Sequence, residues 1–136
     1  MLYITRKFHF SASHKVSIAS WSNEENLRVF GKCANPNGHG HNYIMEVTVA
    51  GKADAVTGYV MDLKELNRIV EDELIEKIDH KNLNVDVDFL KDINPTTENL
   101  AIAFWNEIEK HINNDKRKLH SLRLFETEKN SVEYRG

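Results

Sequence analysis

The alternation of apolar and polar side chains along residues 2–14, LYITRKFHFSASH, constrains the fold more than any other feature of the chain. Successive side chains of a strand point to opposite faces of the sheet. The residues that share one face of this strand are Phe8, Phe10, Ala12 and His14. Residues 41–51, HNYIMEVTVAG, alternate well enough for a second strand and are rich in Tyr, Ile and Val. The sequence therefore predicts two strands of one sheet.

Two later segments carry an apolar residue at every fourth position, the spacing that lines one face of a helix. In the first, which starts at Leu63, the row is Leu66, Val70, Leu74 and Ile78. In the second, where Thr96 or Thr97 is the expected N-cap, the row is Leu100, Phe104, Ile108 and Ile112. A shorter helix is predicted within residues 21–31, because Ser22 and Glu25 have capping-box spacing and Gly31 can end it.

The order of the elements favours an α+β fold. A turn and a short third strand are predicted in residues 51–63, GKADAVTGYVMDL, and a hairpin in residues 119–135 with its turn near Glu128–Asn130. Strands grouped without strict β-α-β alternation suggest an antiparallel sheet with its helices on one face. The edges of such a small sheet would be exposed, and other subunits could cover them.

Composition limits the kind of protein. With 136 residues, 40% hydrophobic and 29% charged, the chain is expected to form a single domain over residues 1–136. A net charge of −3 and the lack of a basic stripe argue against a nucleic-acid partner. No apolar run approaches the roughly 20 residues of a membrane span, and the start of the chain does not resemble a signal peptide. A single cysteine favours a reducing, cytoplasmic location.

The stretch from Cys33 to Tyr43, CANPNGHGHNY, contains the strongest indication of chemistry. His39 and His41 are two residues apart, so their imidazoles share one face of a strand, and His14 can supply a third nitrogen. Three neutral imidazoles suit Zn²⁺ and leave a fourth position open, as in catalytic zinc sites. Two other interpretations stay open: ordinary surface or turn histidines, and a structural zinc site closed by Cys33.

Cys33 precedes a run of turn-forming residues, which places it on or beside a loop. A thiol near Zn²⁺ and an imidazole can be held partly as thiolate, the form that accepts a proton. The simpler alternative is a buried, small hydrophobic side chain. We favour the catalytic role.

Two further clusters contain ionisable residues. Asp79 precedes His80 just past the end of a helix, where it can orient the imidazole and raise its basicity, although an exposed helix end also explains the pair. Glu126 lies at the end of a strand, where it can accept paired N–H donors from a planar heterocycle or simply be solvated.

The motifs FSASH, CANPNGHGHNY, DHKNL, PTTEN and FETEKNSVEY resemble, in order, the signatures of 6-pyruvoyl-tetrahydropterin synthases, from about Phe8 to Tyr134. The resemblance implies a tunnelling fold: a four-stranded antiparallel sheet with two helices, assembled as a homohexamer of two trimers whose sheets join into barrels. It also implies a zinc-dependent lyase of tetrahydrobiopterin biosynthesis. Such enzymes convert 7,8-dihydroneopterin triphosphate to 6-pyruvoyltetrahydropterin and release inorganic triphosphate.

The resemblance assigns roles to individual residues. The implied Zn²⁺ ligands are His14, His39 and His41. Cys33 would be the proton acceptor, with Asp79 and His80 as its relay partners. Glu126 would anchor the pterin ring. The segment that lies along the pterin would be Thr96, Thr97 and Glu98.

Three alternative functions stay open. The 6-carboxy-tetrahydropterin synthases of queuosine biosynthesis use similar chemistry, but they usually have three residues between the cysteine and the first histidine of His-x-His. Here five residues intervene, Ala34 to Gly38, which favours the pyruvoyl reaction. A non-catalytic zinc- or pterin-binding module would be expected to lose Cys33 or the Asp79–His80 pair, and both are present. A zinc hydrolase is less well supported, since no His-Glu-x-x-His motif occurs.

Overall fold

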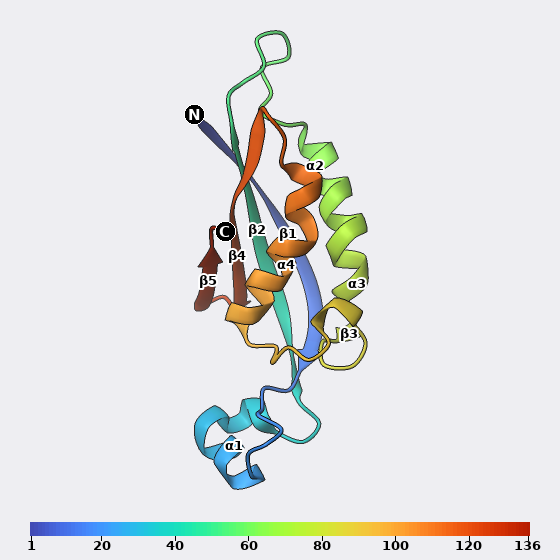
Figure 1. The fold of residues 1–136 in the computed structure, drawn as a ribbon, viewed down its shortest axis with the longest axis vertical. Coiled ribbons are helices and arrows are strands. Elements are labelled where there is room, and N and C mark those ends of the chain that lie inside the picture. The colour runs from blue at the N-terminus through green and yellow to red at the C-terminus, as the bar shows by residue number, and fades with distance from the viewer.

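The computed structural model describes all 136 residues, Met1–Gly136. A single sheet runs along the molecule, and helices cover one of its faces (Figure 1). The sheet has the strand order β3-β1-β2-β4-β5. Its strands are β1 Leu2–His14, β2 His39–Gly51, β3 Lys81–Asn82, β4 Arg117–Thr127 and β5 Asn130–Tyr134.

The four long strands are antiparallel, which confirms the predicted α+β sheet. The pairing of β1 with β2 is continuous from Leu2 opposite Gly51 to His14 opposite His39. The fifth strand, β3, was not predicted. It contributes two residues in parallel to β1 at Ala12 and Ser13, so the sheet is mixed.

The helices also agree with the predicted apolar rows. The first helical segment comprises α2 Leu63–Val70, a π-helical turn Glu71–Ile75 and α3 Glu76–Ile78, and the second is α4 Thr97–Ile112. The N-caps are Asp62 and Thr96, whose side chains accept hydrogen bonds from backbone N–H groups of the first turn. All eight residues of the two rows are buried against the sheet in one core. No helix is long and apolar enough to cross a membrane.

Helix α1, Asn23–Phe30, lies beyond the end of the sheet, apart from the other helices (Figure 1). Ser22 caps it, as predicted. The buried Asn26 side chain accepts a hydrogen bond from the backbone N–H of Ile18 and donates one to its carbonyl oxygen. The backbone N–H of Val16 donates to the carbonyl oxygen of Cys33 at 2.8 Å. These bonds hold the segment between β1 and β2, which contains α1 and Cys33, against the end of β1.

The predicted third strand within residues 51–63 is wrong. The segment forms a loop, because the carboxylate of Asp54 accepts hydrogen bonds from the backbone N–H groups of Val56 and Thr57, and Gly58 has φ +75°. These bonds turn the backbone before the short apolar run at Val60 and Met61 can pair with a strand.

Candidate metal centre and active site

Three histidines converge at one end of the sheet, on the face that the helices cover. His14 lies opposite His39 in the β1–β2 register, and His41 lies opposite Ala12, so the three side chains share one face. The ring centroids are 4.6 to 5.2 Å apart. The Nε2 atoms of His39 and His41 are separated by 2.8 Å. The pattern in the sequence predicted this convergence.

The His14 ring is oriented by the backbone before helix α4. Its Nδ1 lies 2.7 Å from the carbonyl oxygen of Pro95. A carbonyl can only accept, so Nδ1 carries the proton and donates it, which leaves Nε2 with a free lone pair. That Nε2 atom is buried and has no hydrogen-bond partner in the protein. A metal ion beside it would satisfy the atom, and metal-ligating histidines usually have such an oriented second nitrogen.

Glu126, near the end of β4, completes a group of four donors. Its Oε1 lies 3.3 Å from Nε2 of His41, and the Thr97 hydroxyl donates to its Oε2 at 2.5 Å. The ligand atoms of this group, His14, His39, His41 and Glu126, all lie within 4.8 Å of one another. Such a set of imidazole nitrogens and one carboxylate oxygen can hold a divalent cation.

The electrostatics of the site favour neutral imidazoles. Burial lowers the pKa of His14 in spite of the hydrogen bond to Pro95, and burial also lowers the pKa of His41. Only the unprotonated nitrogen of an imidazole can bind a metal ion, so the lowered pKa values keep both rings able to bind a cation at neutral pH.

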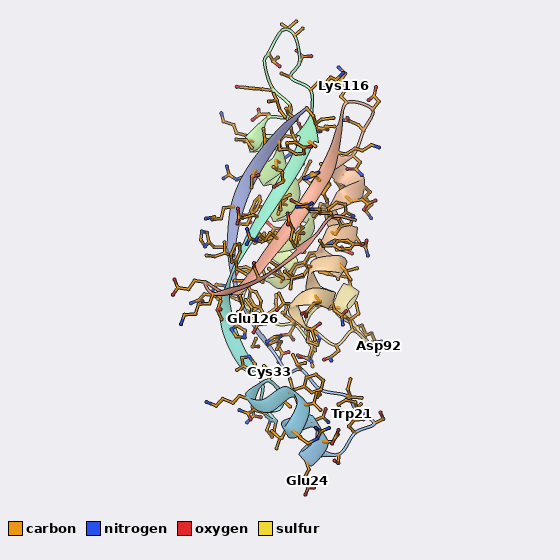
Figure 2. The ribbon with its side chains drawn as sticks, turned by 90° about the vertical axis from the view of Figure 1, so that its left-hand side faces the viewer. Trp21, Glu24, Cys33, Asp92, Lys116 and Glu126 are labelled. Atoms are coloured by element: carbon orange, nitrogen blue, oxygen red, sulfur yellow. The ribbon has the colours of Figure 1, made fainter.

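Cys33 lies on a short 3-10 turn, Gly31–Ala34, between α1 and β2, and is partly buried. Figure 2 shows it at the same end of the sheet as Glu126. Burial first, and then the negative charge of Glu126, raises the pKa of its thiol. The protein alone therefore keeps this thiol protonated, and a cation in the histidine cluster would offset both effects.

Tyr43 is next to His41 on the same face of β2, two residues further along the strand. Its ring stacks on Phe10 at 4.8 Å and meets the His41 ring edge-on at 5.5 Å. Burial raises the pKa of its hydroxyl well above the ordinary value. The sequence indicates no functional role for Tyr43, because a tyrosine in an apolar strand pattern indicates only core packing.

The Asp79–His80 pair is formed but lies outside the histidine cluster. Nδ1 of His80 is 2.9 Å from the Asp79 carboxylate, which also accepts the backbone N–H of Ser11 at 2.9 Å. The hydrogen bond from Ser11 is the main cause that lowers the pKa of Asp79, and His80 lowers it further. The His80 side chain is 82% exposed.

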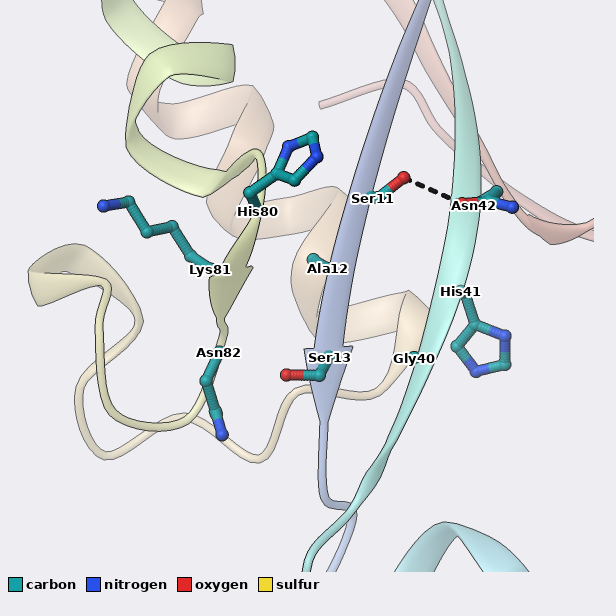
Figure 3. A pocket seen from close by; sticks show the side chains of 9 residues that line it. All are labelled: Ser11, Ala12, Ser13, Gly40, His41, Asn42, His80, Lys81 and Asn82. Atoms are coloured by element: carbon teal, nitrogen blue, oxygen red, sulfur yellow. Dashed lines mark hydrogen bonds between the residues drawn. The ribbon is translucent and has the colours of Figure 1, made fainter.

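His80 borders a polar pocket of about 370 Å³ on the edge of the sheet, whose lining also includes Ser11, Ser13, His41 and Lys81. In Figure 3 strands β1 and β2 separate the His80 ring from the His41 ring. His80 also has φ +61°, a left-handed backbone conformation that is uncommon for residues other than glycine. Within one chain, this pair therefore does not face the metal cluster.

The three residues of the predicted pterin-binding segment lie at the start of α4. The Thr96 hydroxyl accepts the backbone N–H of Asn99 as the N-cap, and the buried Thr97 hydroxyl contacts Glu126. Glu98 is exposed in the first turn. Of these three residues, Thr97 is the one whose side chain contacts the metal cluster, through Glu126.

Comparisons with known proteins agree with this architecture. The profile of the family described as 6-pyruvoyl tetrahydropterin synthase matches residues 3–136. A 6-pyruvoyl tetrahydrobiopterin synthase of Poecilia reticulata is 48% identical over 134 residues, which cover 98% of this chain and 90% of that protein. The human protein of the same name is 44% identical over 133 residues, with the same coverage.

A solved structure of Caenorhabditis elegans 6-pyruvoyl tetrahydropterin synthase superposes with a TM-score of 0.92 at 36% identity, and the match covers 99% of this chain and 95% of that one. The profile match and the relatives both extend over nearly the whole chain, so they include every element that builds the cluster. The chain belongs to the 6-pyruvoyl tetrahydropterin synthase family.

Proposed function

We propose that the protein is a zinc-dependent 6-pyruvoyl-tetrahydropterin synthase, a carbon–oxygen lyase that converts 7,8-dihydroneopterin triphosphate to 6-pyruvoyltetrahydropterin in tetrahydrobiopterin biosynthesis. The observation that carries the proposal is the buried, unpartnered Nε2 of His14, which lies in one cluster with His39, His41 and Glu126. Family membership supports the pterin substrate. We also propose that residues 1–136 work as one cytoplasmic domain.

The residues present fit Zn²⁺. His14, His39 and His41 would hold it, because two of these rings have lowered pKa values and one has an oriented, unprotonated nitrogen. When bound, the ion supplies Lewis acidity toward hydroxyl oxygens of the substrate. The fourth donor, Glu126, would then be free to contact the pterin, because three protein ligands leave one position for the substrate.

The chain's own residues would perform the proton transfers and fix the substrate. Cys33 would accept the proton from the side-chain carbon next to the pterin ring, after the positive charge of the site has lowered the pKa of its thiol. Glu126, held by the Thr97 hydroxyl, would accept N–H groups of the ring. Thr96 and Glu98 would border the pterin from the start of α4. The triphosphate would leave by C–O cleavage, with no redox cofactor.

Asp79 and His80 would carry protons away from Cys33 or return one to the ring. Because His80 points outward from its own chain, we propose that it acts at the site of a neighbouring subunit. This arrangement requires an oligomer, and we propose a homohexamer in which the exposed sheet edges of each trimer join into a barrel. The Asp79 carboxylate, fixed by Ser11, would orient the imidazole.

Product analysis tests the proposal. The purified protein, loaded with Zn²⁺, is incubated with 7,8-dihydroneopterin triphosphate, and the pterin products are identified by mass spectrometry. We expect 6-pyruvoyltetrahydropterin and inorganic triphosphate. A carboxylated pterin together with acetaldehyde would instead identify the 6-carboxy-tetrahydropterin synthase reaction of queuosine biosynthesis.

A Cys33→Ala variant separates catalysis from binding. We expect turnover to collapse while the metal content, measured by elemental analysis, and the size of the oligomer stay unchanged. A wild-type protein that binds metal and pterin without turnover would instead be a non-catalytic binding module. Full activity of Cys33→Ala would exclude the thiol as the proton acceptor.

A further inference from the structure

The pocket beside His80 is lined by hydrogen-bonding side chains and by no carboxylate. Nine residues line it, only Ala12 among them is hydrophobic, and none is acidic, although the chain has 21 Asp and Glu residues. Ser11 and Ser13 share one face of β1, and Asn42 lies opposite Ser11 on β2. This is the face of the sheet that the helices leave open (Figure 1). A hollow of this composition is suited to an anion rather than to a cation.

Hydrogen bonds within the protein determine which atoms of the two asparagines in the lining stay free. Oδ1 of Asn42 accepts the Ser11 hydroxyl at 2.7 Å, and Oδ1 of Asn82 accepts the backbone N–H of Asn84 at 2.9 Å. Both amide oxygens are therefore occupied, whereas neither amide NH₂ group has a partner in the protein. An NH₂ group can only donate. The two asparagines thus offer donors to a ligand, which is what an anion requires.

The charges around the pocket agree with an anionic ligand. Lys81 is the one permanent cation in the lining. Its side chain extends away from β1 in Figure 3, so it lies at the rim, and its flexible four-carbon stem can turn toward a ligand. The carboxylate of Asp79 is not part of the lining, and it already accepts the backbone N–H of Ser11 and contacts His80. The free donors of the pocket therefore face no competing carboxylate.

We infer that this pocket holds the triphosphate group of the substrate that is bound at the neighbouring subunit's metal centre. The inference rests on the proposed function, in which His80 acts at that centre. His80 borders the pocket, and the phosphates are attached to the same short side chain that loses the proton, so a substrate within reach of the imidazole brings its phosphates to the pocket. Hydrogen bonds to a charged acceptor are stronger than those to a neutral one. The pocket would therefore select phosphorylated over unphosphorylated pterins.

The Asn42→Asp variant tests the inference, because it keeps the acceptor for Ser11 but replaces the NH₂ donor by a carboxylate oxygen that repels phosphate. We expect the zinc-loaded variant to bind inorganic triphosphate roughly tenfold more weakly than the wild type in isothermal titration calorimetry, since like charges this close oppose each other. The KM for 7,8-dihydroneopterin triphosphate should rise in parallel, and binding of unphosphorylated 7,8-dihydroneopterin should not change. Asn106→Asp, exposed on α4 and outside the pocket, adds the same charge and is the matched control.

Asn42→Ala removes the donor without adding charge and should show a smaller loss in the same direction; it carries the test if Asn42→Asp does not fold. An unchanged affinity of the folded Asn42 variants for triphosphate would overturn the inference, and so would an equal loss in Asn106→Asp or an equal loss for unphosphorylated 7,8-dihydroneopterin. If the wild type does not convert the substrate but Asn42→Asp still loses affinity for triphosphate, the proposed function fails and the anion site stands. Turnover by the wild type with unaffected Asn42 variants defeats the inference alone.

Discussion

The backbone of Gly38 lies directly against the carbonyl group of His14. A Cβ atom on residue 38 would clash with the His14 oxygen and lie 3.0 Å from the carbonyl carbon, and Gly38 also has φ +68°. The close approach brings the start of β2 beside the end of β1, so that His39 meets His14. Gly38 therefore sets the distance between two proposed metal ligands through its contact with the His14 backbone, although it has no side chain to offer the metal.

A Gly38→Ala variant should lose both stability and metal. The left-handed backbone alone costs an alanine about 1 to 2 kcal/mol, and the clash with His14 forces the two strands apart. Thermal unfolding and zinc content measure the two effects. Gly40→Ala is the control, because its Cβ would lie at an ordinary 3.5 Å from the Ala12 oxygen. Equal behaviour of the two variants would contradict the role of the Gly38–His14 contact.

The metal-free protein should become less stable as the pH falls below about 6.5. Burial lowers the pKa of His14 and His41 in the folded state, whereas unfolded histidines titrate near 6.5. Between the folded and unfolded pKa values the unfolded chain binds more protons than the folded one. The free energy of unfolding therefore rises with pH across that window, and below the window it stays at its lower value. Urea midpoints of chelator-treated protein between pH 8 and pH 5.5 measure this slope.

His14→Gln should reduce that slope, since it removes one of the two groups and retains a donor for the Pro95 carbonyl. His9→Gln is a suitable control, because His9 is exposed on the opposite face of β1. A pH profile that is flat in the wild type, or unchanged in His14→Gln, would show that burial of these imidazoles does not affect stability.

Local patterns were sufficient to predict most of the fold. The bounds of β1 were predicted as found, because its side chains alternate along the whole strand and one face is buried. Both helices were found through their apolar rows. The short run at Val60 and Met61 misled the prediction, since the turn around Asp54 depends on side-chain hydrogen bonds that hydrophobic periodicity does not report.

The site was predictable only where its residues share a local pattern. His39 and His41 are neighbours on one strand, and His14 ends the strand that pairs with it. The place of Glu126 beside His41 depends on the register of β2 with β4, which shifts between Thr48 and Val49 and cannot be read from either strand alone. Likewise, the pairing of β3 with β1 and the hydrogen bond from Ser11 to Asp79 fix the Asp79–His80 pair beside β1, and neither can be read from the local sequence.

The Thr97 hydroxyl should control the orientation of the Glu126 carboxylate. A Thr97→Val variant removes the donor but keeps the shape, and a hydrogen bond to a charged group contributes about 1.5 to 3 kcal/mol. We expect at least a tenfold lower kcat/KM, mainly through a higher KM for the pterin. Thr97→Ser retains the hydroxyl and should stay close to the wild type. Steady-state kinetics of both variants, with the zinc content as a check, distinguish this role from simple packing.

Two inactive variants should restore activity when they assemble together. Cys33→Ala lacks the proposed proton acceptor, and His80→Asn lacks the relay imidazole while asparagine tolerates φ +61°. If each site combines Cys33 of one subunit with His80 of a neighbour, about a quarter of the sites in a randomly mixed 1:1 oligomer contain both intact residues. If both residues came from the same chain, every site would carry one defect and no activity would return.

The measurement is turnover after joint unfolding and refolding of the two variants, and refolding each one with the wild type controls for subunit exchange. Because the His80 side chain is exposed and separated from His41 by two strands, we expect activity to return.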